Sequence, residues 1–236
     1  MSQIKFKGTG PGKQTQDGCS VEFYRLLKPQ GEPELIASAV PEHGTILELG
    51  CGVGRVTHPL VDLGFTLTAV DNSAEMLAYV KGAETICTDI ENLDLSKKFD
   101  AVLLMSHMIN IPDMTVRSAL LKTCYRHLKW SGSMILQCHP ADLIQKIKVG
   151  HVGMADGIET YVDKLEVEGN LAELTLRWQH HLGTWTQSFE TEILNLSQIE
   201  QSLEIAGLKF KKWLDSESTI FIACHVDHST FCHDYD

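Results

Sequence analysis

The sequence has 236 residues, of which 43% are hydrophobic and 22% are charged. This length suits one large domain or one domain with an insertion, and the composition is that of a globular protein rather than a disordered or fibrous one. The 20 Lys and Arg residues against 31 Asp and Glu give a net charge of −11. Such a charge repels nucleic acids and anionic membranes unless a basic patch overrides it, and the longest lysine runs are pairs. We therefore expect neither nucleic acid nor a membrane as a partner.

The cysteine content and the apolar stretches indicate a reducing compartment. No apolar run approaches the roughly 20 residues that cross a bilayer, and the first residues lack the apolar core of a signal peptide. The seven cysteines are an odd number, dispersed through a chain that is large enough to fold without disulfides. We expect free thiols and a cytoplasmic location.

The first part of the chain is polar and contains two short helical patterns. Residues 1–20 are rich in Gly, Lys, Thr and Gln, which predicts a mobile lead-in. Helices are predicted over residues 21–27 and 34–39, because each pattern is followed by a proline that stops it.

Strands and helices alternate from residue 45 onward. Apolar runs predict strands at residues 45–49, 66–70, 85–88, 99–105 and 133–138. Helical patterns between them cover residues 55–63, 73–81 and 116–128. Strands joined by crossover helices pair in parallel, so we expect an open α/β sheet whose ligands bind at the carboxyl ends of its strands.

The pattern changes after Gly157. Apolar and polar residues alternate over residues 161–168, 171–178 and 184–194, with glycine-containing breaks between them, which predicts an antiparallel meander. Ser197 to Glu200 matches a capping box that opens a helix ending at Gly207. Residues 208–214 and 219–226 predict a closing hairpin. The predicted units are a lead-in with lid helices (1–44), a cofactor-binding α/β core (45–150), an inserted β meander (151–196) and the closing helix and hairpin (197–236).

A glycine motif lies where the first predicted strand turns into a helix. Gly50, Gly52 and Gly54 allow a tight turn and close approach of a ligand, and the following helix offers free N–H groups. The dinucleotide fingerprint would place its third glycine at position 55, where Arg55 stands, so NAD and FAD are disfavoured. Glu48, just before the turn, would repel a pyrophosphate but can hold a cationic group or order water around it.

Acidic residues end the next two predicted strands. Asp71 is placed to accept both hydroxyls of a ribose, and Asp89 with Ile90 offers an acceptor for an exocyclic amine beside an apolar wall for a base. Together they outline an adenosine. The glycines alone could merely permit tight packing, but acids at both strand ends favour a binding site. We add Asn72 and Ser106, which lie next to these strand ends, to the expected cofactor site.

These motifs resemble those of class I S-adenosylmethionine-dependent methyltransferases over residues 45–138 and 197–226. The resemblance implies a Rossmann-like sheet of seven strands, mostly parallel with the last antiparallel, and S-adenosylmethionine as a cofactor that leaves as S-adenosylhomocysteine. It also implies that Asp71 binds the ribose, that Asp89 and Ile90 contact the adenine, and that Tyr24 belongs to an N-terminal lid over the cofactor. The family's Leu-Lys-Pro-Gly-Gly turn appears here with Trp130 in place of its proline, which puts only that turn in doubt.

The resemblance implies methyl transfer to an oxygen or nitrogen of a small molecule. Such a transfer needs alignment, a water-poor pocket and a base when the nucleophile starts protonated. His107, just beyond the fourth predicted strand, is the candidate catalytic base, although a histidine there could equally bond the backbone or line the cofactor. The motif of amino-methylating nucleic-acid enzymes is absent from this segment. The alternatives are a noncatalytic cofactor-binding protein, a methyltransferase of protein or RNA, and an NAD-dependent oxidoreductase.

The predicted meander and the C-terminal tail carry two further candidates. The meander could roof the pocket, with Tyr161, Trp178 and Trp185 recognising an acceptor, or these aromatic residues could seal a core or a homodimer interface. The Cys and His residues between 224 and 234 are zinc-type ligands, but their spacing matches no familiar site. We therefore expect no metal.

Overall fold

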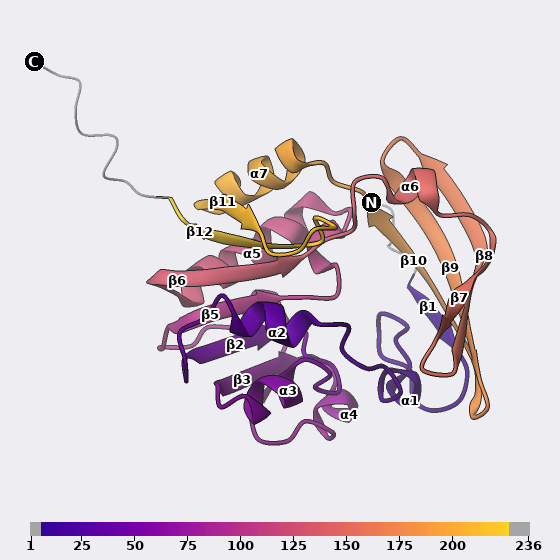
Figure 1. Ribbon diagram of the computed structural model, residues 1–236, viewed down its shortest axis with the longest axis horizontal. Coiled ribbons are helices and arrows are strands. Elements are labelled where there is room, and N and C mark those ends of the chain that lie inside the picture. The colour runs from indigo at the N-terminus through magenta and orange to yellow at the C-terminus, as the bar shows by residue number, and fades with distance from the viewer. Residues whose placement is uncertain (1–5, 227–236) are drawn as a thin grey trace, which may run out of the picture.

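The computed structural model describes residues 6–226, and its central element is a seven-stranded sheet (Figure 1). The strand order is β11-β12-β6-β5-β2-β3-β4. The strands are β2 (Thr45–Leu49), β3 (Thr66–Asp71), β4 (Glu84–Cys87), β5 (Phe99–Leu104), β6 (Leu128–Gln137), β11 (Leu208–Trp213) and β12 (Ile220–His225). Every neighbouring pair is parallel except the two that contain β12, which runs antiparallel to β6 and β11. The predicted sheet with one antiparallel last strand is confirmed.

Helices cover both faces of this sheet. Helices α2 (Glu32–Ala37) and α3 (Thr57–Asp62) bury Ile36 and Leu60 against one face, whereas α5 (Met114–His127) and α7 (Leu196–Ile205) pack on the other. The alternating side chains of β2 divide between these two cores, as a buried parallel strand requires. Helix α4 (Ala74–Leu77) is shorter than predicted, because the N–H groups of Tyr79 and Val80 donate to carbonyls three residues back rather than four. The Lys81 N–H then donates to His58 Nε2.

A second, antiparallel sheet stands to one side of the first, with the short helix α1 (Val21–Tyr24) beside it (Figure 1). Its strand order is β1-β10-β9-β8-β7. The strands are β1 (Lys7–Thr9), β7 (Gly150–Ala155), β8 (Ile158–Glu168), β9 (Leu171–His180) and β10 (Gly183–Glu192). The predicted meander is confirmed. Strand β7 is an additional edge strand that was not predicted, because its two glycines and exposed side chains do not give the alternating pattern of a strand.

The N-terminal segment differs from the prediction of a mobile lead-in. Lys7–Thr9 pairs with β10, and the Trp185 indole donates to the carbonyl of Pro11 at 2.9 Å. Close packing requires glycine at position 8, because a Cβ there would lie 1.9 Å from the carbonyl oxygen of Gly18. This segment is therefore part of the antiparallel sheet.

Two further sequence predictions concern the start of α7 and the state of the cysteines. The capping box is formed by Asn195 and Gln198, each side chain bonding the other's backbone N–H, so the predicted cap at Ser197 is wrong by two positions. The cysteines within residues 6–226 are free thiols. In this described part of the chain no helix is long and apolar enough to span a membrane.

Candidate active site

The glycine motif forms the tight turn that leaves β2. The N–H groups of Gly50 and Cys51 both donate to the carbonyl of Val70, at 2.8 and 2.9 Å, which fastens the turn to the end of β3. Gly52 has a φ of 55°, a left-handed conformation that favours glycine, and no atom lies within 4 Å of where its Cβ would be. The backbone at this position is therefore open to close approach by a ligand.

Asp71 joins the ends of β2 and β3. One of its carboxylate oxygens accepts the N–H of Gly52 at 2.8 Å, and the other accepts the N–H of Ser73 at 2.9 Å. Burial raises the pKa of Asp71, and these two backbone donors oppose the rise. Nearby, the Asn72 amide donates to Asp89 at 3.0 Å, and Ile90 is buried directly after that carboxylate. These predicted site residues thus lie at the same edge of the sheet.

Glu48 lies beneath the glycine turn. Its side chain is buried, and one of its oxygens accepts a hydrogen bond from the Thr57 hydroxyl at 2.6 Å. Burial raises the pKa of this carboxyl to about 7, although the bond from Thr57 and the charge of Arg55 oppose that rise. The carboxyl is therefore on the point of changing its protonation state near neutral pH.

His107 follows β5 and forms a stacked pair with His139, which follows β6. The two ring centroids are 4.1 Å apart and the planes differ by 10°. Burial lowers the pKa of His107 to about 4 and that of His139 to about 3, so both rings are neutral at neutral pH. Ser106, which precedes the pair, has its N–H bonded to the Gln137 side chain at 2.9 Å.

Sequence reasoning did not identify His139. It directly follows the predicted strand 133–138, but its place beside His107 depends on the order of the strands, which was not predicted. Adjacent parallel strands end at the same edge, so residues one or two positions beyond both ends are candidates for contact.

The N-terminal segment packs against the glycine turn. The Tyr24 hydroxyl accepts a hydrogen bond from Cys19 Sγ at 3.1 Å, and Cys19 packs with Val53 and Met76. Burial raises the pKa of Tyr24 well above its ordinary value. A pocket opens between α1 and the turn, lined by Tyr24, Arg25, Leu27, Val53, Arg55, His58 and Tyr79.

Part of the chain matches a known protein family. Residues 46–132 match the model of a family described as a methyltransferase domain. The ubiquinone biosynthesis O-methyltransferase of Bradyrhizobium diazoefficiens is 32% identical over 99 residues, which is 39% of this chain and 38% of that protein. The malonyl-[acyl-carrier protein] O-methyltransferase of Pectobacterium atrosepticum is 28% identical over 71% of this chain and 56% of its own length. The chain thus spans less than two thirds of these two relatives.

Solved structures share the fold at low sequence identity. An S-adenosylmethionine-dependent methyltransferase from Clostridium acetobutylicum superimposes with a TM-score of 0.70 at 18% identity, covering 86% of this chain and 94% of that one. The sugar N-methyltransferase KedS8 from Streptoalloteichus gives 0.67 at 17% identity, covering 92% and 98%. Residues 46–132 of this chain therefore match a methyltransferase domain, and the chain shares the fold of solved S-adenosylmethionine-dependent methyltransferases. The matched residues include the glycine turn and the ends of β2, β3, β4 and β5, but not the end of β6.

The aromatic residues of the second sheet lie on its two opposite faces. Trp185 is 2% exposed and clusters with Trp178 and Phe23 of α1, with the Phe23 and Trp178 rings stacked 4.4 Å apart. Tyr161 instead lies under the Arg177 guanidinium, 4.1 Å from the ring centroid. The two tryptophans therefore seal a core between the sheet and α1, which was the alternative to acceptor recognition.

The predicted zinc-type ligands of the tail fall mostly outside the described residues. His225 is buried in β12, where its Nε2 lies 3.2 Å from the Leu128 carbonyl and its ring stacks on Trp130. Residues 227–236 are not described. Within residues 6–226 no group of three potential metal ligands comes together.

Proposed function

We propose that this protein transfers the methyl group of S-adenosylmethionine to an oxygen or nitrogen nucleophile of a small molecule and releases S-adenosylhomocysteine. The observation that carries this proposal is the meeting of four strand ends at one edge, which brings together the glycine turn, Asp71, Asp89 and His107. The names of the relatives and neighbours include an O-methyltransferase of ubiquinone biosynthesis and a sugar N-methyltransferase, which supports a small acceptor and both kinds of nucleophile.

The residues at this edge fit an adenosine that carries a sulfonium. Each oxygen of Asp71 holds one backbone N–H and keeps acceptor capacity for a ribose hydroxyl. Asp89, oriented by Asn72, offers an acceptor beside the apolar side chain of Ile90. The bound cofactor supplies an electrophilic methyl group, and the nearby acidic side chains favour its positive charge.

The remaining predicted site residues surround this edge. Gly50 and Gly54 shape the turn, Glu48 supports it from below, and Ser106 lies at the end of β5. Tyr24 belongs to the N-terminal segment over the turn. Their direct contacts with the cofactor remain predictions.

His107 is the candidate base on the acceptor side. Within the described residues no hydrogen bond holds its ring, and the pKa of about 4 keeps that ring neutral and able to accept a proton. Its role is to take the proton that the nucleophile loses, while the residues around the bound acceptor align the nucleophile and exclude water.

Incubation with labelled S-adenosylmethionine and a small-molecule extract of the source cells tests the activity. We expect labelled small products whose mass exceeds that of a precursor by one methylene group. Binding of S-adenosylhomocysteine in calorimetry without any transfer would favour the noncatalytic alternative, and label on protein or RNA alone would overturn the substrate class. Fluorescence titration with NADH tests the oxidoreductase alternative.

His107→Gln tests the base. We expect a loss of about 10²- to 10⁴-fold in the transfer rate with unchanged S-adenosylhomocysteine binding. The exposed His181, changed to Gln in the same way, is the control and should have no effect. Because neutral imidazole is the active form, the wild-type rate should fall only as the pH drops toward about 4. A His107→Gln variant that keeps the wild-type rate contradicts the role.

The remaining assignments extend this proposal. Residues 6–44 add a strand to the second sheet and form the lid, residues 45–150 bind the cofactor, residues 151–196 cap the substrate or form a dimer interface, and residues 197–226 close the core. A cytoplasmic location is consistent with the free thiols at residues 6–226. A homodimer remains a prediction, which size-exclusion chromatography with light scattering tests.

A further inference from the structure

Asn110 connects both members of the histidine pair to the antiparallel sheet. It ends the short 3₁₀ helix η2 (Met108–Asn110) and is 1% exposed. Its backbone N–H donates to the His107 carbonyl at 2.9 Å, and its side-chain oxygen accepts the N–H of His139 at 3.0 Å. Its side-chain amide donates to the Glu192 carbonyl at 2.7 Å, at the end of β10. One buried side chain, carried by the loop after β5, thus contacts the loop after β6 and the second sheet.

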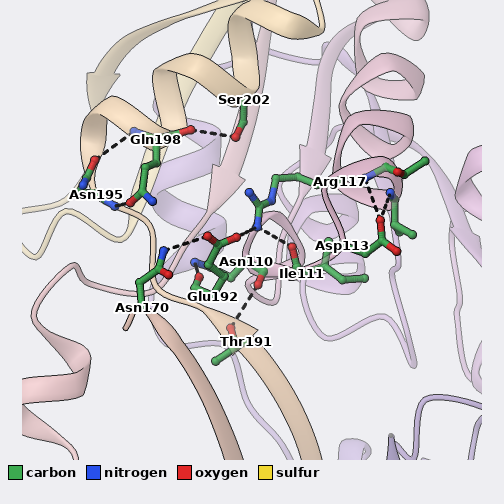
Figure 2. A network of polar contacts seen from close by, with 12 residues as sticks. Asn110, Ile111, Asp113, Arg117, Asn170, Thr191, Glu192, Asn195, Gln198 and Ser202 are labelled. Atoms are coloured by element: carbon green, nitrogen blue, oxygen red, sulfur yellow. Dashed lines mark hydrogen bonds and ion pairs between the residues drawn. The ribbon is translucent and has the colours of Figure 1, made fainter. Parts of the chain in front are cut away.

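A second set of contacts fixes the end of β10 (Figure 2). Arg117 of α5 is buried, donates to the Ile111 carbonyl at 2.6 Å and forms an ion pair with the Glu192 carboxylate. The other oxygen of that carboxylate accepts the Asn170 amide at 2.8 Å. Glu192 therefore gives Asn110 a fixed partner rather than a mobile loop.

The backbone around His107 needs such support. Ser106 and His107 have φ values of 55° and 60°, and two successive non-glycine residues in the left-handed region persist only where neighbouring contacts hold them. Within the described residues no hydrogen bond holds the ring of His107 or of His139, so the stacked geometry depends on where the two backbones lie. Asn110 bonds both of those backbones.

We propose that Asn110 is a positioning residue that holds His107 and His139 face to face at the acceptor side of the site. The effect of Asn110 on catalysis rests on the proposed function, whereas its effect on the geometry of the two histidines is independent of that function. Loss of the Asn110 side chain releases the His139 backbone and the end of β10 together, and the His107 ring then loses its stacked neighbour.

The test compares Asn110→Ala with Asn170→Ala. Both substitutions remove an asparagine that donates to Glu192, but only Asn110 also touches the histidine pair. The readouts are the imidazole carbon and proton NMR signals of His107 and His139, calorimetry with S-adenosylhomocysteine, and kcat for the products that the wild-type protein labels in the cell extract. His107→Gln and His139→Gln assign the two sets of signals.

For Asn110→Ala we expect shifted signals of both imidazoles, a fall in kcat of about 10- to 100-fold and unchanged S-adenosylhomocysteine affinity, with wild-type behaviour for Asn170→Ala. Unshifted imidazole signals in Asn110→Ala, or equal losses in Asn170→Ala, overturn the proposal. If Asn110→Ala does not fold, Asn110→Leu, which is close in size and lacks both the acceptor for His139 and the donor to Glu192, is judged by the same criteria. A wild-type protein that labels nothing refutes the proposed function, whereas the NMR comparison still decides the positioning role.

Discussion

The assignment of Asp71 to the ribose can be tested by Asp71→Ala. The carboxylate accepts two backbone N–H groups, from Gly52 and Ser73, and in the proposed complex it also accepts ribose hydroxyls. Hydrogen bonds to a charged group contribute about 1.5 to 3 kcal/mol when buried, and partial exposure of Asp71 lowers that range. We expect a loss of about 1 to 3 kcal/mol in cofactor binding, which is about 5- to 150-fold in Kd.

Calorimetry with S-adenosylhomocysteine measures this loss. Asp62→Ala is the matched control. Asp62 is an exposed carboxylate at the end of α3, and its substitution removes one negative charge, as Asp71→Ala does. Asp71→Asn keeps the shape and one acceptor oxygen, so its loss should be smaller than that of Asp71→Ala. If Asp71→Ala binds S-adenosylhomocysteine as tightly as Asp62→Ala, the ribose assignment is wrong.

Two further predictions concern the glycine turn and are measured by urea unfolding without cofactor. Glu48→Gln should flatten the pH dependence of the free energy of unfolding. The pKa of Glu48 is about 7 in the folded protein against an ordinary value of 4.5, so between these two pH values the folded state keeps a proton that the unfolded state releases. The wild-type protein therefore loses stability as the pH rises from 4.5 to about 7. The variant should therefore gain most, relative to wild type, above pH 7, and an unchanged difference across the window contradicts the burial effect. Gly54→Ala should destabilise more than Gly52→Ala. Each substitution costs about 1 to 2 kcal/mol of folding stability, because it places a side chain on a residue with left-handed backbone angles. Only at Gly54 would the new Cβ also lie 2.8 Å from the His58 ring. The reverse order contradicts this reasoning.

The central sheet was predictable because each of its strands carries a local signal. The segment Thr45–Leu49 is a short apolar run followed by glycines, and its bounds agree with the prediction. The N-terminal strand Lys7–Thr9 has no such signal, because its pairing depends on β10, which lies far away in the sequence. At α7 the predicted cap was Ser197, whereas Asn195, two residues earlier, caps the helix by accepting the N–H of Gln198.

The predictability of the site follows the same distinction. Asp71 and Asp89 were identified because each ends its own strand, which is a local property. The pairing of His107 with His139 requires the order of the strands as well, and the role proposed for Asn110 requires the position of the second sheet. Candidate site residues that follow their own strand end could therefore be proposed from the sequence, whereas those whose proposed role depends on a neighbouring strand could not.

The electrostatic environments of the two sides of the site differ in a way that suits methyl transfer. The proposed cofactor side contains the acidic residues Glu48, Asp71 and Asp89, whose negative charge would favour a positively charged sulfonium. A protonated imidazole on the opposite side would repel that charge. Burial prevents this, because it holds the pKa of His107 at about 4 and that of His139 at about 3, and the proximity of His107 lowers the pKa of His139 further. The stacked pair therefore stays neutral beside a cation, and a neutral His107 is the form that can accept a proton from the nucleophile.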